Sequence, residues 1–380
     1  MARQKHIEWF QRGARTLRAL ARETGREDAF PTCEEWYVCP LCLDGLTIEE
    51  LDTGELTVEH VPPAKLGGSE LVLTCKQCNN RDGGKFDGQA HREDRLRRLL
   101  SGQAERPETV TFAVDGVGTR VEMRTAGPTG MLFLPVLGIN NPADEARMEE
   151  HMRELSASRS TDFHVTITPQ VTYSPDHARI SWVRAGYLAA FALFGWRYIL
   201  RPTLQPIRDQ LMNPSAVTLP SLSMYVPDGD PDRREIWIIK KPVERQSLLV
   251  MAGQHGIFLP LPNDGRSLAE LADCISGDAP GPVRHNFTGD MIWWPPGPVH
   301  LLDPSRLPSS GLSSSGSEPE RGRGAVRDLA ARSGSSPWRP SATGLPGRDG
   351  GEATRPGVPG QEKACTMAEG SGTPLPFAYG

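Results

Sequence analysis

The sequence contains neither a membrane-spanning stretch nor a secretory leader. Its longest apolar run, Ala185 to Trp196, is bounded by Arg184 and Arg197 and is too short to cross about 30 Å of hydrocarbon. The first 24 residues include no apolar core of the kind that signal peptides need. We therefore expect a cytoplasmic protein without a membrane partner, in which the apolar run forms a buried helix.

A strong positive charge is also absent. The net charge is −5 at pH 7, and acidic residues slightly outnumber basic ones even over residues 1–100. This composition argues against a protein that binds nucleic acid through a uniformly basic surface, so any contact with phosphates must come from local basic patches. With 380 residues, 38% of them apolar, the chain is long enough for two or more cores.

The number of cysteines does not suit a disulfide framework. There are seven, an odd number, and four of them form two Cys-x-x-Cys pairs at residues 39–42 and 75–78. Such pairs in a reducing compartment are typical of metal binding. The remaining three, Cys33, Cys274 and Cys365, have no partner at ligand spacing and are assigned no role.

The paired cysteines predict a zinc site. A Cys-x-x-Cys turn directs two sulfurs at one ion, and two such turns complete a tetrahedral set of four thiolates. The predicted ligands are Cys39, Cys42, Cys75 and Cys78. Four thiolates leave no open coordination position, so this zinc is expected to be structural, and its binding would stabilise a segment too small for a large core.

Three candidates for chemistry lie within the same segment. His60 is able to accept a proton near neutral pH, and Glu59 beside it offers a hard oxygen to a divalent cation. Asn79 directly follows the last cysteine, where its side-chain oxygen is a candidate second ligand. A base and a hard cation are the two requirements for hydrolysing a phosphodiester bond.

Residues 39–87 resemble the HNH endonucleases of the zinc-stabilised ββα-metal type. The shared pattern is Cys-x-x-Cys, an acid–His pair followed by proline and Gly-Gly, and then Cys-x-x-Cys-Asn. The resemblance implies a treble-clef-like nuclease module that cuts nucleic acid, here expected to be DNA, with one Mg²⁺ or Mn²⁺. It also implies that His60 is the general base and that Glu59 and Asn79 bind the catalytic metal.

The chain departs from the family pattern at two positions. The acid of the acid–His pair is often Asp in the family and is Glu59 here, and the family's middle asparagine is replaced by Glu70. The second departure favours a rival hypothesis, a non-catalytic zinc module that binds nucleic acid or protein. A third hypothesis, hydrolysis of a small molecule by the zinc itself, fits four thiolates poorly.

Weaker candidates surround these residues, and each has a plain structural alternative. Asn80 is a possible support for Asn79 and Asp87 an additional ligand, unless both cap loops. His91 is interpreted as a helix-surface residue. Basic groups that would contact phosphates, or simply face solvent, are Lys65, Lys76, Arg81 and Lys85, with the arginines of an amphipathic helix predicted over residues 3–24.

The overall pattern predicts an α+β protein with four segments. Residues 1–30 form the N-terminal helix, 31–104 the nuclease module, 105–302 a second α+β domain, and 303–380 a disordered tail rich in Ser, Gly, Pro and Arg. Within the second domain, Asp115-Gly116 marks a β-hairpin, a long apolar helix covers residues 177–200, and residues 248–259 are read as a strand.

Overall fold

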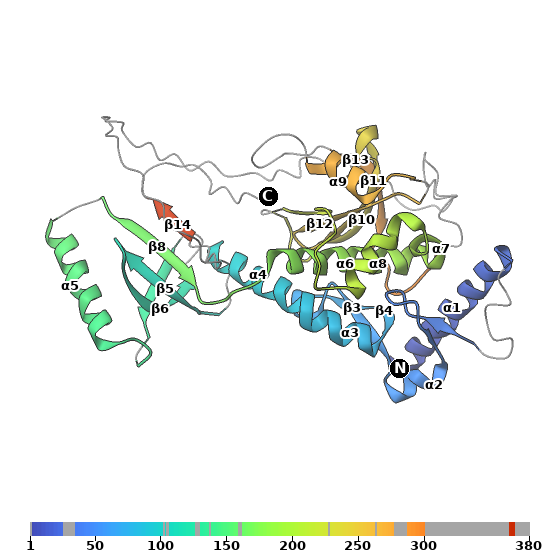
Figure 1. Cartoon of the computed structure of the whole chain (residues 1–380), viewed down its shortest axis with the longest axis horizontal. Helices are drawn as coiled ribbons and strands as arrows, with labels where there is room; N and C mark the ends of the chain where they lie inside the picture. Colours follow the sequence, from blue (N-terminus) through green and yellow to red (C-terminus); the bar gives the residue numbers. More distant parts are fainter. Residues whose placement is uncertain are drawn as a thin grey trace, which may run out of the picture. The chain divides into compact units, whose positions relative to one another are not determined.

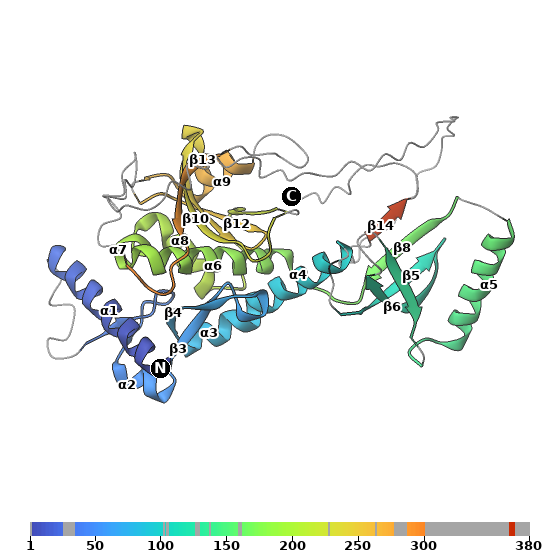
Figure 2. The same cartoon turned by 180° about the vertical axis from the view of Figure 1, so that it is seen from behind.

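The structure, a computed structural model, describes most of the chain up to residue 300 (Figures 1 and 2). The described residues are 2–25, 35–101, 103, 106–125, 130–136, 138–158, 162–226, 229–262, 264–276, 287–300 and 365–368. They fall into two compact units: one holds the residues up to Glu93 and those from Tyr173 to 300, and the other holds Asp94–Thr172 with 365–368. Each unit is described by itself.

The first unit begins with helix α1 (Ala2–Glu23), which buries one face. The apolar residues at helical spacing, Phe10, Ala14 and Leu17, are all buried, as the amphipathic pattern predicts. The helix packs against the short paired strands β1 (Tyr37–Val38) and β2 (Gly45–Leu46), where Phe10 stacks on Tyr37 with ring centroids 6.0 Å apart. The turn between these two strands carries Cys39 and Cys42, the first Cys-x-x-Cys pair.

A β-hairpin and a helix follow directly. Helix α2 (Ile48–Thr53) ends at Gly54, which has a φ of 77°, and leads into β3 (Leu56–Val61). Strand β3 pairs antiparallel with β4 (Ser69–Cys75), and a bulge shifts the register so that Glu59 faces Val72 while His60 faces Glu70. After β4 come α3 (Lys76–Asp82), a single π-helical turn η3 (Gly83–Asp87) and α4 (Gly88–Leu100).

Helix α6 (Pro175–Phe194) is the centre of the first unit. Every residue from Ile180 to Trp196 is buried, so the helix needs cover on all sides. The hairpin β3–β4 contacts it on one side and a five-stranded antiparallel sheet on the other (Figures 1 and 2). In the order β13-β10-β11-β12-β9, the strands are Thr288–Trp293, Arg234–Lys241, Ser247–Ala252, His255–Leu259 and Ser223–Tyr225.

Shorter elements complete the first unit. Helix α7 (Trp196–Ile199) follows α6 after Gly195, whose φ of 69° breaks the apolar helix that the sequence predicts over residues 177–200. The other elements are η2 (Ala64–Leu66), η4 (Pro202–Leu204), α8 (Gln205–Met212), η5 (Val243–Arg245) and α9 (Leu268–Ser276).

The second unit is an antiparallel sheet with one long helix. The sheet order is β14-β8-β5-β6-β7, with bounds Cys365–Ala368, His164–Pro169, Glu108–Val114, Val117–Thr125 and Met131–Pro135. Asp115 and Gly116 turn the chain between β5 and β6, as predicted. Helix α5 (Pro142–Ser158) contacts β6, and the core includes Leu99 from the end of α4.

The mixed α+β character is confirmed, but the compact units do not follow the predicted segments. Residues 173–300 lie with the N-terminal segment and not with residues 105–172. The physical reason is helix α6, which is apolar on every side. The five-stranded sheet covers only one side of it, and the β3–β4 hairpin of the N-terminal segment covers another. The predicted strand over residues 248–259 is a hairpin, because Gly253 turns the chain with a φ of 64°. Apart from β14, the predicted tail lies outside the described residues.

In the described part of the chain, no helix has both the length and the apolar composition needed to cross a bilayer. Helix α6 contains most of the longest apolar run of the sequence, but its surface is covered by other parts of the first unit. This finding agrees with the interpretation of residues 185–196 as a buried helix.

Candidate metal centre and the adjoining charged cage

The four predicted zinc ligands come together in the structure. Cys39 and Cys42 lie on the turn between β1 and β2, and Cys75 and Cys78 lie at the end of β4 and in the first turn of α3. All four Sγ atoms are within 4.8 Å of one another, and those of Cys42 and Cys75 are 3.7 Å apart. Tetrahedral zinc with Zn–S bonds of about 2.3 Å would separate the sulfurs by about 3.8 Å. This cysteine cluster therefore has the dimensions of a site for a metal such as zinc.

Hydrogen bonds to sulfur support this assignment. The backbone N–H of Cys75 donates to Cys39 Sγ at 3.4 Å, and that of Cys78 donates to Cys75 Sγ at 3.3 Å. Burial raises the pKa of Cys39, whereas hydrogen bonds from the other thiols, above all Cys39, lower the pKa of Cys75. One sulfur of the cluster thus ionises readily while burial and its neighbours oppose ionisation of the rest, and a bound cation would hold all four as thiolates.

Glu59 lies on β3, and its carboxylate is bound to an arginine from α6. Oε1 accepts a hydrogen bond from Arg184 Nη1 at 3.1 Å, and Oε2 is 2.9 Å from Nη2 in an ion pair without hydrogen-bond angles. The Glu59 side chain is 4% exposed and that of Arg184 is 1% exposed. The predicted metal ligand is therefore the buried partner of a guanidinium group.

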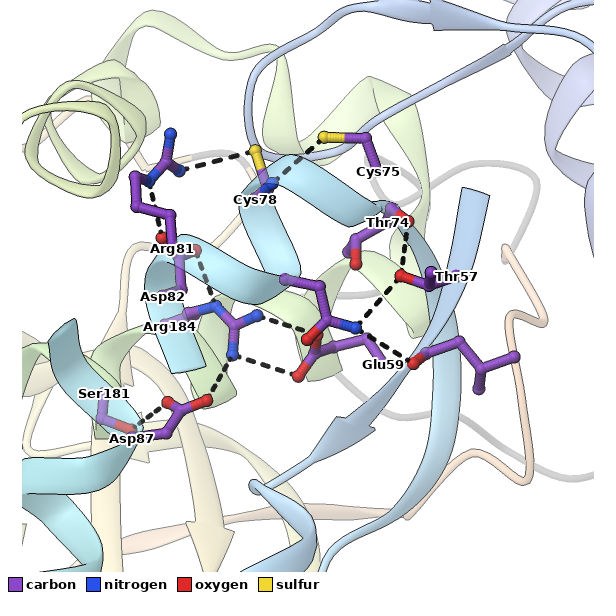
Figure 3. Close-up of polar contacts among 12 residues, drawn as sticks. Thr57, Glu59, Thr74, Cys75, Cys78, Arg81, Asp82, Asp87, Ser181 and Arg184 are labelled. Carbon is purple, nitrogen blue, oxygen red and sulfur yellow. Dashed lines mark hydrogen bonds and ion pairs between the residues drawn. The ribbon is translucent and has the colours of Figure 1, made fainter. Parts of the chain in front are cut away.

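Two aspartates complete the surroundings of this guanidinium (Figure 3). Asp82, the last residue of α3, accepts from Arg184 Nε at 3.0 Å, and Asp87 in η3 accepts from Nη1 at 3.4 Å. Their other oxygens accept from Arg81 Nε at 2.9 Å and from Ser181 Oγ at 2.7 Å, respectively. We call Glu59, Asp82, Asp87 and Arg184 the carboxylate cage.

The electrostatics of the carboxylate cage reflect its burial. Burial raises the pKa of Glu59, Asp82 and Asp87, and the charge of Arg184 opposes this rise at each carboxyl group. For Arg184 itself burial acts to lower the pKa, but the three carboxylates, Glu59 foremost, raise it above its ordinary value. The arginine therefore stays charged, and the geometry joins β3, α3, η3 and α6 at one point.

His60, the predicted general base, is the penultimate residue of β3. Its side chain is half-buried, and no hydrogen bond or ion pair to its imidazole is found among the residues that the structure describes. Opposite it, Glu70 Oε2 lies 3.2 Å from Lys5 Nζ and 3.4 Å from His6 Nε2. Partial burial works against ionisation of Glu70, but the hydrogen bonds from His6 and Lys5 prevail and lower its pKa. Glu70 thus connects the hairpin to α1 and leaves the imidazole unengaged.

Asn79, the other predicted metal ligand, is tied to β3. Its Nδ2 donates to Thr57 Oγ1 at 3.1 Å and to the backbone oxygen of Val58 at 3.3 Å. Since a carbonyl oxygen can only accept, the amide nitrogen must face Val58, and this fixes the orientation of the amide. The side-chain oxygen Oδ1 consequently points the other way, and no partner for it is found in the described part of the chain.

The loop between β3 and β4 is closely packed. A Cβ atom on Gly68 would lie 1.4 Å from the backbone oxygen of Pro62, so only glycine fits there. Arg234 of β10 donates to the backbone oxygen of Gly67 at 3.2 Å. The loop that follows His60 is therefore held by its own sequence and by the five-stranded sheet.

Among the weaker candidates, some side chains have charged or sulfur partners and others are exposed. Asp87 belongs to the carboxylate cage, and Arg81 donates to Cys78 Sγ at 3.5 Å as well as to Asp82. Lys76 pairs with Glu55 at 3.0 Å. Exposed side chains are Asn80, Lys65 and Lys85, while His91 is half-buried on α4. Cys274 is a free cysteine on α9, and Cys33 lies outside the described residues.

Sequence reasoning missed the centre of the cage. In the sequence, Arg184 stands out only as the boundary of an apolar run, and no motif marks Asp82 or Ser181. A signal did exist: an arginine inside a stretch that is otherwise apolar on every helical face must be buried, and buried charges are normally paired. Comparisons with protein families, curated proteins and solved structures find no match for this chain.

Proposed function

We propose that the protein is a metal-dependent nuclease that hydrolyses phosphodiester bonds, with DNA as the expected substrate. In this proposal the β3–β4 hairpin with α3 is a ββα-metal module of the HNH type, built on structural zinc held by the cysteine cluster. His60 is the general base, and Glu59 and Asn79 hold one Mg²⁺ or Mn²⁺. The observation that carries the proposal is the fixed orientation of Asn79, whose amide nitrogen is bound to β3 and whose oxygen is left for a ligand.

The residues have the chemistry that each step needs. The His60 imidazole is free to accept a proton from an attacking water, since no polar partner occupies it among the described residues. A divalent cation beside it would stabilise the negative charge that develops on the phosphate and the leaving oxygen. Glu59 and Asn79 offer the hard oxygen atoms that such a cation prefers. The exposed amines of Lys65 and Lys85 are suited to bind the phosphate backbone.

One observation favours a second candidate, a non-catalytic zinc module. Both carboxylate oxygens of Glu59 face the Arg184 guanidinium, which already balances part of their charge. If that ion pair leaves no room for a cation, the cysteine cluster and the hairpin would still form a stable surface for binding nucleic acid or protein. The two candidates differ in whether His60 matters for the activity of the folded, zinc-loaded protein.

The test is metal-dependent cutting by the full-length, zinc-loaded protein. Plasmid DNA and RNA are incubated with Mg²⁺ or Mn²⁺ and, separately, with a chelator that removes those ions but leaves zinc bound. We expect wild-type protein to cut with the divalent ion and His60→Ala to lose at least about a hundredfold in rate, the typical contribution of a general base.

A matched control is His151→Ala in the second unit. His151 Nε2 lies 3.3 Å from Asp115 and belongs to neither the cysteine cluster nor the carboxylate cage. This variant should cut like wild type, and zinc content measured by mass spectrometry should be equal in all three proteins. Equal cutting by wild type and His60→Ala, or no cutting by a fully zinc-loaded wild type, would overturn the nuclease proposal.

A further inference from the structure

Arg184 comes from a helix about a hundred residues beyond the proposed nuclease residues, yet it binds one of them directly. Its side chain is 1% exposed, so it is inaccessible to a substrate. Both of its terminal nitrogens contact Glu59, and its remaining contacts are the two aspartates of the carboxylate cage. Any effect that Arg184 has on catalysis must therefore pass through these carboxylates, and Glu59 is the one proposed to bind the metal.

We infer that Arg184 is a positioning residue of the proposed divalent-metal site, where it sets the direction of the Glu59 carboxylate. The inference rests on the proposed function and adds a residue that lies outside the HNH-like segment. Each oxygen of a carboxylate has two lone pairs, so the contacts with Arg184 leave one on each oxygen for a cation. The site that results is oriented by the protein before the metal binds.

The orientation depends on the forked shape of the guanidinium. Two parallel contacts hold the plane of a carboxylate, whereas the single ammonium of lysine holds only one point. Arg184 is itself fixed, because Nε binds Asp82 and Nη1 also reaches Asp87. Ser181, one helical turn earlier on α6, in turn holds Asp87 at 2.7 Å.

The charges agree with this role. Arg184 and Arg81 oppose three carboxylates, which leaves one negative charge in excess if all three are ionised. Five of the six carboxylate oxygens accept a hydrogen bond, and the sixth, Glu59 Oε2, is paired with Arg184 by charge alone, so little rotation is open to the carboxylates. A divalent cation at Glu59 would meet both a fixed ligand and the excess negative charge.

The experiment measures Mn²⁺ binding and cutting in parallel on zinc-loaded, full-length protein. Bound Mn²⁺ is determined from the electron paramagnetic resonance signal of the free ion, with Glu59→Gln as the baseline for binding elsewhere. For Arg184→Lys we expect Mn²⁺ affinity to fall about tenfold, the usual effect of losing the partner of a metal ligand. The Mn²⁺ concentration for half-maximal cutting should rise equally, while the rate at saturating Mn²⁺ changes little.

Two further variants keep the inference falsifiable. Ser181→Ala removes one hydrogen bond from Asp87 and should weaken Mn²⁺ binding about threefold, so it decides the question if Arg184→Lys does not fold. Arg201→Lys is the matched control, because the Arg201 guanidinium donates to the backbone oxygens of Leu261 and Asp264 and lies outside the carboxylate cage. It should bind Mn²⁺ like wild type.

The outcomes separate this inference from the proposed function. Wild-type Mn²⁺ affinity in folded, zinc-loaded Arg184→Lys, or in Ser181→Ala if the first does not fold, would overturn the positioning role. So would the absence of any binding that depends on Glu59. If wild type binds Mn²⁺ through Glu59 without cutting, and Arg184→Lys weakens that binding, the nuclease proposal fails while the positioning role stands.

Discussion

Two polar clusters connect helix α3 with the β3–β4 hairpin, and they differ in the source of their positive charge. The cysteine cluster brings together four groups of the same kind, whose sulfurs lie within 4.8 Å of one another. The carboxylate cage places the Arg184 guanidinium among Glu59, Asp82 and Asp87. A cation at the first cluster would have to come from solution, whereas the second has a cation that is part of the chain.

Because of this difference, the two clusters should respond to different changes. Removing the metal should disturb the cysteine cluster and leave the carboxylate cage unchanged. Replacing Arg184 should disturb the carboxylate cage and leave the cysteine cluster unchanged. Arg81 is placed between them, since it donates to Cys78 Sγ and to Asp82 (Figure 3). Substitutions in each cluster can show whether the two act independently.

The largest effect is expected from loss of the metal. Cys75→Ser removes one of four thiolates, and the cost should be on the order of 10 kcal/mol, since structural zinc contributes about that much to folding small domains. Such a loss exceeds the stability of many whole domains, so the hairpin and α3 should unfold. Zinc content by mass spectrometry and thermal unfolding by circular dichroism are the measurements.

Cys274→Ser provides the control for this change. Cys274 is a free cysteine on α9 and lies outside the cysteine cluster, so its replacement should leave zinc content and the melting temperature unchanged. A zinc-free Cys75→Ser protein that melts at the wild-type temperature would show that the cysteine cluster is not a structural metal site.

An intermediate effect is expected from Arg184→Met. The methionine fills similar space but leaves three buried carboxylates without their shared cation, which should cost about 3–5 kcal/mol of unfolding free energy. Urea denaturation of the zinc-loaded protein measures this, with Arg201→Met as the matched control, which removes hydrogen bonds to backbone oxygens and leaves the cage intact. Zinc stoichiometry should stay at the wild-type value. A loss below about 1 kcal/mol, typical of a surface ion pair, would contradict a structural role for the cage.

The smallest effect is expected from Arg81→Met. The Arg81 side chain is partly exposed and donates to both clusters, so its loss should cost about 1 kcal/mol and weaken zinc binding a few-fold. A competition assay with a zinc chelator measures the affinity. Arg179→Met is the control, because its ion pair with Asp176 lies on the surface of α6. Equal zinc affinity in Arg81→Met and wild type would mean that the two clusters are not coupled through this residue.

The cysteine cluster could be predicted from the sequence because its information is local. Each Cys-x-x-Cys turn brings two sulfurs together within four residues, so only the meeting of the two turns depends on the tertiary fold, and that prediction is confirmed. Helix α1 and the β5–β6 hairpin were predictable for the same reason, since period and turn residues are local signals. The HNH-like role of His60 stays a prediction.

The carboxylate cage could not be predicted in this way. Glu59 and Arg184 are separated by 125 positions, and nothing near either residue specifies the other. Their meeting depends on α6 packing between the hairpin and the five-stranded sheet, and this also explains why the compact units differ from the predicted segments. A lone arginine in an apolar helix shows that a buried partner exists, but its identity comes only from the tertiary arrangement.

The bond between Asn79 and the carbonyl of Val58 restricts which side chain is suited to follow Cys78. An aspartate there would place a carboxylate oxygen against that carbonyl oxygen. Both oxygens are hydrogen-bond acceptors, so no hydrogen bond would form between them. A neutral amide carries a hydrogen-bond donor and an acceptor. Its nitrogen joins helix α3 to strand β3, while its oxygen keeps its lone pairs for a metal ion. A single uncharged residue can thus serve both the architecture of the hairpin and the chemistry proposed beside it.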